Sequence, residues 1–94
     1  MPLSFEWDEQ KARTNLRKHG VSFEEATTVF GDPLSRTISD PLHSDEENRF
    51  VIIGRSFINR LLVVIYTERG DNIRIIAARE ATSREKKAYA ENEE

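Results

Sequence analysis

Hydrophobic and polar residues follow one another along the chain in a pattern that predicts helices first and strands afterwards. The apolar segment Leu3–Trp7 predicts a short first strand, with Trp7 in the core, and residues 9–19 are rich in strong helix formers. Asp8 stands before them as an N-cap, and Gly20 follows as the left-handed residue that commonly ends a helix. The buried side of this helix is expected at positions i, i+4 and i+7, namely Ala12, Leu16 and His19.

A second helix is predicted to begin at Ser22. Glu25 lies three residues later, so the pair matches the pattern of a capping box. The apolar side of this helix carries Phe23, Ala26 and Phe30. The helix is expected to end at Gly31-Asp32-Pro33, because proline cannot continue a helical hydrogen-bond ladder.

Strand-like segments fill most of the second half of the chain. The segments are Leu34–Ser39, then, after a polar loop at 40–48, Arg49–Ser56, Arg60–Glu68 and Asn72–Arg79. Their short connections predict antiparallel hairpins. The third of these strands, Arg60–Glu68, is apolar at nearly every position, so we expect both of its faces to be covered.

A last helix is predicted to open at Thr82, with Glu85 completing a second capping box and only a thin apolar side at Ala88–Ala90. The expected order is therefore β-α-α-β-β-β-β-α. This order predicts an α+β fold with a mostly antiparallel sheet packed against helices.

Length and composition predict one small domain spanning residues 1–94, without disulfides or thiolate metal ligands, because the chain holds no cysteine. The absence of cysteine fits a reducing cytoplasm. The first residues lack the basic and apolar regions of a signal peptide, and the longest apolar run, Leu61–Tyr66, is too short to cross a bilayer. We expect no cofactor and no membrane association.

Charge is distributed unevenly. The whole chain has a formal charge of −3, yet residues 49–79 hold six arginines against two acids, which makes this region +4. A basic sheet in an acidic protein predicts a local anion site, with RNA or DNA phosphate as the leading ligand. The arginines are Arg49, Arg55, Arg60, Arg69, Arg74 and Arg79.

Arg69 and Arg79 end neighbouring strands. In a tight hairpin these ends diverge, which places Arg79 near Arg60 and predicts a cluster of those two with Arg49 or Arg55. Arg79 is also expected on the same face as the alternate residues Ile73, Ile75 and Ala77. For any one arginine the simpler explanation is solubility or a salt bridge to Glu68, Glu80 or Glu85; for the group we favour an anion site, since guanidinium forks suit phosphate.

Other polar residues offer weaker candidates. His19, in Lys18-His19-Gly20, can transfer a proton near neutral pH, but a cation in the last turn of a helix also complements the helix dipole, and spacing alone favours that role. Packing is the expected role of Tyr66 and Tyr89. His43 with the nearby acids Asp45, Glu46 and Glu47 matches no metal-ligand spacing and is expected to be a charged loop.

Several segments together resemble the BrnT family of toxins. The similarity covers nearly the whole chain, in the family's order: Phe5–Ala26, Gly31-Asp32-Pro33, Arg60–Arg69 and Ile73–Arg79, followed by Glu85 and Tyr89. The resemblance implies a RelE-like fold and a ribonuclease toxin of a bacterial type II toxin–antitoxin system, which stops translation by cutting RNA. It also implies a partner, a BrnA-type antitoxin with a ribbon-helix-helix domain, in a complex of two copies of each chain that reaches operator DNA only through the antitoxin.

The resemblance further implies that lysines and arginines, rather than a metal, handle the phosphate. The catalytic candidates carried onto this chain are Lys18, His19, Arg69 and Arg79, and the lower-ranked RNA-contact candidates are Arg49, Arg55 and Tyr89. A second function class stays open: a non-catalytic or decayed adaptor that binds a DNA-binding partner and tunes promoter autoregulation.

Overall fold

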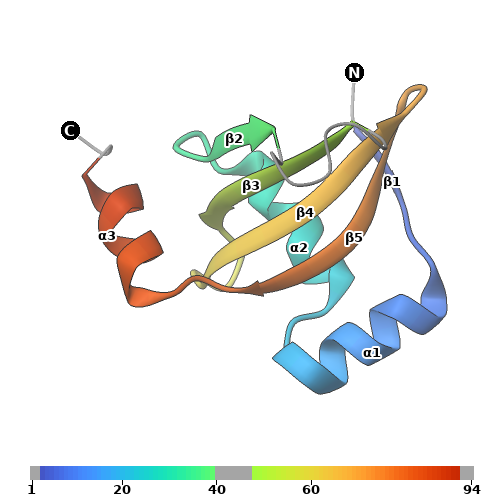
Figure 1. The fold of residues 1–94 in the computed structure, drawn as a ribbon, viewed down its shortest axis with the longest axis horizontal. Coiled ribbons are helices and arrows are strands. Elements are labelled where there is room, and N and C mark those ends of the chain that lie inside the picture. Colours follow the sequence, from blue (N-terminus) through green and yellow to red (C-terminus); the bar gives the residue numbers. More distant parts are fainter. Residues whose placement is uncertain (1–2, 40–47, 92–94) are drawn as a thin grey trace.

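The computed structural model describes residues 3–39 and 48–91. Within these residues a five-stranded sheet is accompanied by three α-helices, in the order that the sequence predicts (Figure 1). The elements are β1 (Ser4–Glu6), α1 (Glu9–His19), α2 (Phe23–Thr28), a 3-10 turn η1 (Val29–Gly31), β2 (Arg36–Ser39), β3 (Arg49–Arg55), β4 (Leu61–Arg69), β5 (Asn72–Glu80) and α3 (Ser83–Ala90). The α+β fold is confirmed.

The sheet has the strand order β1-β5-β4-β3-β2. Only β1 runs parallel to its neighbour, β5; the other three pairings are antiparallel. The mostly antiparallel sheet is thus confirmed. The central strand β4 is buried along most of its length, as its continuous apolar sequence predicts.

Helices lie on both sides of the sheet, but unequally. Leu62 and Val64 point from β4 into the main core, which includes residues of α2. Leu61 and Val63 point the opposite way, into a smaller cluster with Tyr89 of α3. Figure 1 shows α3 at one end of the sheet only, so the rest of that face carries no helix of the described chain.

The predicted buried side of α1 is right for Ala12, which packs against the core, and wrong for Leu16 and His19. Leu16 is 51% exposed and His19 is exposed, whereas Asn15 is buried at 7% exposure. The Asn15 amide nitrogen donates to the Ala78 and Val21 carbonyls (2.8 and 2.9 Å), and its oxygen accepts from the Ala78 N–H (3.1 Å). The Asn15 side chain therefore pairs with the outer edge of β5 as a neighbouring strand would, and this polar contact orients the helix.

One of the two hydrogen bonds of the capping box predicted for α2 is present. Ser22 Oγ accepts from the Glu25 N–H at 3.0 Å, but the Glu25 side chain does not return to the cap. It binds Ser56 and Arg60 instead, at 6% exposure. The capping box of α3 is complete, with Thr82 and Glu85 each bonding the other's backbone.

A bulge in β5 changes which residues share a face. Ile65 of β4 pairs with Ala77, while Tyr66 pairs with Ile75, so Ile76 is an extra residue. Ile73 and Ile75 consequently face the main core, while Ala77 and Arg79 face the other way. The prediction that all four share one face is wrong for this reason.

The remaining core expectations are confirmed. Trp7 packs edge-on against Phe23, with ring centroids 5.9 Å apart, and Tyr66 is buried against Phe30. The charged loop at His43 lies outside the described residues. No helix among residues 3–39 and 48–91 is long and apolar enough to cross a membrane.

Candidate functional site

Rows of side chains cross the face of the sheet that points away from α1 and α2, with one residue from each of β2 to β5 in the first two rows and from each of β3 to β5 in the third. Starting at α3, the rows are Arg36–Ile53–Val63–Arg79, then Ile38–Val51–Ile65–Ala77, then Arg49–Thr67–Arg74. We call this surface the open face. Arg55 lies just beyond the first row, opposite Leu61. The open face is therefore aliphatic in the middle and carries arginines along its margins, which suits a ligand with a phosphate backbone.

Arg79 lies at the α3 end of the open face, where it is held by Glu85. Its two terminal nitrogens donate to the two Glu85 carboxylate oxygens at 2.8 and 3.0 Å, a planar, bidentate pair. The Arg79 guanidinium lowers the pKa of Glu85 to about 2 against the opposing effect of burial, and Glu85 raises the pKa of Arg79. The Arg79 side chain is still 41% exposed, so a phosphate can approach it from solvent. Of the salt bridges expected for this arginine, the one to Glu85 is the one found.

Arg55 and Tyr89 lie together at the same end. The Arg55 guanidinium carbon is 5.5 Å from the centre of the Tyr89 ring, a cation–π contact. The Tyr89 hydroxyl donates to Asp32 Oδ2 at 2.5 Å, and the Tyr89 residue is 2% exposed. The packing role expected for Tyr89 is thus confirmed, and its ring also supports a candidate arginine.

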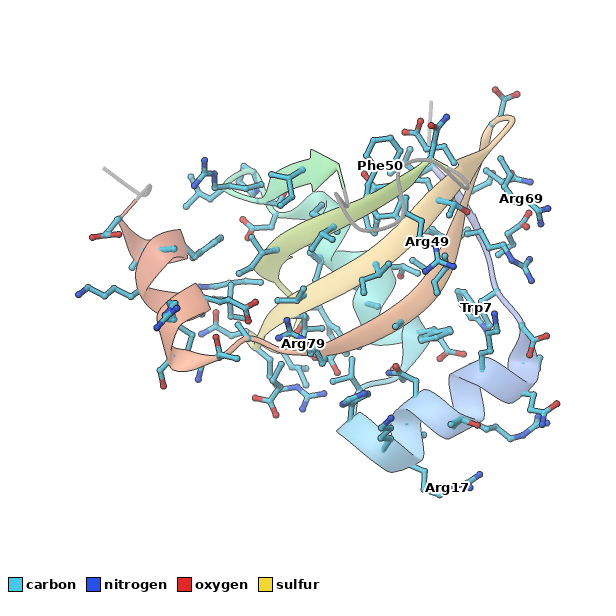
Figure 2. All side chains as sticks on the ribbon, viewed as in Figure 1. Trp7, Arg17, Arg49, Phe50, Arg69 and Arg79 are labelled. Atoms are coloured by element: carbon cyan, nitrogen blue, oxygen red, sulfur yellow. The ribbon has the colours of Figure 1, made fainter. Side chains whose placement is uncertain are left out.

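Lys18 and His19 are exposed in the last turn of α1 and line a hollow of about 500 Å³ between α1 and β5. The hollow also includes Lys11 of α1 and Ala77 of the open face. Asn15 binds the backbone of Ala78, the residue before Arg79, and Lys18 and His19 follow Asn15 by three and four residues, which places them one turn farther along the same side of α1. The structure thus brings the end of α1 to the end of β5 that carries Arg79. Figure 2 shows neighbouring Arg17 pointing away from the sheet.

Arg69 is not part of this group. Arg69 pairs with Asn72 at the β4–β5 hairpin. Asn72 precedes Arg79 by seven residues along β5, which corresponds to roughly 20 Å. Figure 2 shows Arg69 and Arg79 at opposite ends of β5. Arg69 approaches Glu6 at 4.0 Å, beside a closer Arg74–Glu6 pair at 2.9 Å. The predicted divergence of the two hairpin ends is confirmed.

Arg49 lies on the open face but nearer to that hairpin. Its row contains Thr67, and it is separated along β3 by four residues from Ile53, which shares the row of Arg79. That spacing corresponds to roughly 13 Å along the strand.

The predicted cluster is only partly present: Arg60 lines a hollow with Arg55, Glu80 and Lys86, but Arg79 is not part of it. The Arg60 guanidinium binds Glu25 through two nitrogens, one of them at 3.0 Å, and donates to the Gly20 carbonyl at 3.0 Å and to Glu80 at 3.4 Å. These partners lie on the helix side of the sheet. Arg60 and Arg79 lie at the same end of the sheet, but their side chains point to opposite faces. The hydrogen bonds of Arg60 link the end of α1, α2 and β5.

Sequence reasoning missed three residues that the structure places at or beside this end: Arg36, Asp32 and Asn15. The alternation of Arg36 and Ile38 in a short strand could have indicated that both face the same way. Asp32 was assigned only to a helix-ending turn, and no local signal distinguishes Asn15 from any other polar helix residue. Among the described residues, no group of three or more histidines, cysteines or acids is arranged to hold a metal ion.

Comparison with known proteins agrees with the resemblance seen in the sequence. The family described as "Ribonuclease toxin, BrnT, of type II toxin-antitoxin system" matches residues 7–85, well over half of the chain. The crystal structure of the Brucella abortus ribonuclease toxin BrnT has a similar fold, with a TM-score of 0.68 at 22% identity, over 87% of this chain and 100% of the other. No curated protein sequence matches the chain. A likeness to RelE toxins remains a prediction.

Proposed function

We propose, since this chain belongs to the BrnT family of ribonuclease toxins of type II toxin–antitoxin systems, that it cuts RNA without a metal at the end of the sheet that carries Arg79. The observation that supports this location most strongly is the Asn15–Ala78 bridge. It brings the basic end of α1, with Lys18 and His19, to the end of β5 on which Arg79 lies. The hollow between α1 and β5, lined by Lys11, Lys18, His19 and Ala77 among others, is open and its lysines and histidine are exposed, so a flexible strand of RNA can enter.

The proposed chemistry is transesterification by the RNA's own 2′-hydroxyl. A base removes the 2′-proton, the 2′-oxygen bonds to the adjacent phosphorus, and the bond from phosphorus to the 5′-oxygen breaks as that oxygen takes up a proton. The products are a 2′,3′-cyclic phosphate and a 5′-hydroxyl. Protons move through His19 or Lys18, and which of them is base and which is acid stays open.

Arg79 is proposed to stabilise the charge that develops on the phosphoryl oxygens. A fixed guanidinium is worth most where its position is set before the reaction, and Glu85 sets that of Arg79. Arg55, Arg36 and Arg49 line the open face and are proposed to contact flanking phosphates. Arg69, at the far hairpin, is proposed to contact RNA outside the reaction centre.

The proposed partner is a BrnA-type ribbon-helix-helix antitoxin, in a complex of two copies of each chain, which contacts operator DNA through the antitoxin in the cytoplasm. The family supports an antitoxin partner. A groove of about 250 Å³ between β2, β3 and α3 offers an apolar surface to such a partner, lined by Ile38, Val51 and Ile53 among others. This surface is also what a non-catalytic adaptor would use, so the adaptor is kept as the second candidate.

Inducing the chain alone in bacteria tests the activity. We expect growth arrest and fragmented RNA from the unaltered chain, loss of both with Arg79→Ala, and a large reduction with His19→Ala. Arg17→Ala is the matched control, because this arginine is on the same helix and points away from the sheet. Normal growth and intact RNA at confirmed soluble expression would instead favour the adaptor.

Cleavage by the purified chain tests the metal-free mechanism. We expect a chelator to leave the rate unchanged and the RNA fragments to end in cyclic phosphate and 5′-hydroxyl groups. A rate that collapses in chelator and returns with added Mg²⁺ would overturn this part of the proposal, while leaving the ribonuclease assignment in place.

A further inference from the structure

Asp32, in the turn after η1, accepts hydrogen bonds from three separate parts of the chain. Its Oδ1 accepts from the Leu34 N–H at 2.9 Å, as in a turn. Its Oδ2 accepts from the Arg55 N–H at 2.7 Å and from the Tyr89 hydroxyl at 2.5 Å. Burial raises the pKa of Asp32, but these three hydrogen bonds outweigh it and lower that pKa overall. One carboxylate thus joins the turn, the end of β3 and the last turn of α3.

The close approach of this turn to β3 depends on Gly54. A Cβ added at Gly54 would lie 3.1 Å from Asp32 Oδ2 and 2.9 Å from Ser35 Cβ, which is closer than side-chain atoms normally come. The missing side chain therefore allows the carboxylate to reach the Arg55 N–H. This contact places Asp32 beside Arg55 of the open face. Ending α2 does not require such a contact.

The hydrogen bond to Asp32 also defines what Tyr89 can do. Its hydroxyl proton is directed at the carboxylate and the residue is buried, so in this arrangement it does not reach a leaving group on the open face. Its ring is the surface over which the Arg55 guanidinium lies. Arginine otherwise has many rotamers, and a fixed aromatic ring beneath it reduces the entropy lost when the guanidinium binds a phosphate.

We propose that Asp32 is a positioning residue for RNA binding: it fixes Tyr89, and through the Tyr89 ring it holds the Arg55 guanidinium on the open face, ready for a phosphate beside Arg79. The inference rests on the proposed function, because it needs RNA on this face. It assigns Tyr89 to support of an arginine rather than to proton transfer. Together with the Glu85–Arg79 pair, it makes α3 the element that orients two arginines of the site.

The test measures affinity of the full chain for a single-stranded 2′-O-methyl RNA of mixed sequence, which lacks the attacking hydroxyl, at several salt concentrations. Arg55→Ala is expected to weaken binding and to reduce the slope of log affinity against log salt by about 0.7, the value for one phosphate contact on a single strand. Asp32→Asn is expected to do the same, and the double variant Asp32→Asn/Arg55→Ala to lose nothing further.

The sign of the Asp32→Asn effect separates positioning from simple electrostatics. Removing a negative charge beside the RNA by itself strengthens binding, whereas loss of the Arg55 position weakens it. If Asp32→Asn does not fold, Tyr89→Phe takes its place. That change removes one hydrogen bond, keeps the ring, and leaves the bonds from Leu34 and Arg55 to Asp32 intact.

The possible results distinguish the inference from the proposed function. If Arg55→Ala weakens binding equally with and without Asp32→Asn or Tyr89→Phe, Asp32 only stabilises the fold and the inference is wrong. If Arg55→Ala has no effect while Arg79→Ala still abolishes cutting, the inference fails and the proposed function stands. If the unaltered chain neither binds nor cuts RNA, the proposed function itself fails.

Discussion

Replacing Glu85 with glutamine is expected to lower the free energy of unfolding by about 1–2 kcal/mol at pH 7. The Arg79 guanidinium, with a smaller contribution from Thr82 and against the effect of burial, lowers the pKa of Glu85 from 4.5 to about 2. A pKa lowered by about 2.5 corresponds to at most about 3.4 kcal/mol. The two side chains are 41% and 32% exposed, so solvent screening reduces this value to the stated range. Glutamine has the same shape and still accepts a hydrogen bond from the Thr82 N–H, so the change removes the charge and keeps the helix cap.

The difference between the two proteins is expected to shrink in acid. The pKa of Glu85 is lower in the folded chain than in the unfolded chain, so the ion pair contributes fully above about pH 5 and its contribution is lost as pH falls towards 2. At pH 3.5 about three-fifths of it remains by this relation.

Urea unfolding followed by circular dichroism at pH 7, 5 and 3.5 measures this difference. Glu68→Gln is the control, because Glu68 is an exposed glutamate on β4. A Glu85→Gln effect that stays constant from pH 7 to 3.5, or one no larger than that of Glu68→Gln, would refute the argument that the charge of Glu85 fixes α3 to the sheet.

Three further substitutions test the contacts that shape the site. Asn15→Leu is expected to cost about 2–4 kcal/mol, because Ala78 loses its partners for both backbone groups; urea unfolding measures this, and a cost under about 1 kcal/mol would contradict it. Gly54→Ala should destabilise by about 1–3 kcal/mol through three contacts of 2.9–3.1 Å, whereas Gly31→Ala, with no neighbour within 4 Å, should be nearly neutral in thermal melts; equal effects would show that close packing at Gly54 is unimportant. Glu25→Ala should cost about 1–3 kcal/mol in the same melts, since it removes the buried carboxylate that Arg60 and Ser56 bind while Arg60 stays partly exposed, and a near-neutral result would count against this contact.

The ends of the helices are the part of the fold that the sequence predicted well. Asp8, Ser22 and Thr82 each cap a helix by accepting from a backbone N–H three residues on, and Gly20 adopts the left-handed conformation expected after α1. These features depend on residues within one turn of each other, so a single sequence contains all the information they need. The strand boundaries followed for the same reason, because hydrophobic runs and turn residues are local signals.

The errors arose where a contact crosses the fold. Leu16 has the spacing of a core residue, yet α1 is oriented by the polar contact of Asn15 with a strand 63 positions away. Arg60 was grouped with Arg79 because the start of β4 lies beside the end of β5. The Arg60 side chain instead binds the buried carboxylate of Glu25, on the opposite face of the sheet. Neither choice is encoded in the residues nearby.

For the candidate site, the sequence by itself determined the ingredients: an arginine-rich set of strands, a basic end to the first helix, and the family to which they belong. Only the tertiary structure decided which of them meet. The extra residue at Ile76 turns Arg79 to the open face, the Asn15–Ala78 bridge sets the end of α1 beside it, and the length of β5 keeps Arg69 away. The physical reason is that side-chain direction in a strand has a period of two, so one bulge, specified by packing across the sheet rather than by its own residues, reverses the face of everything that follows it.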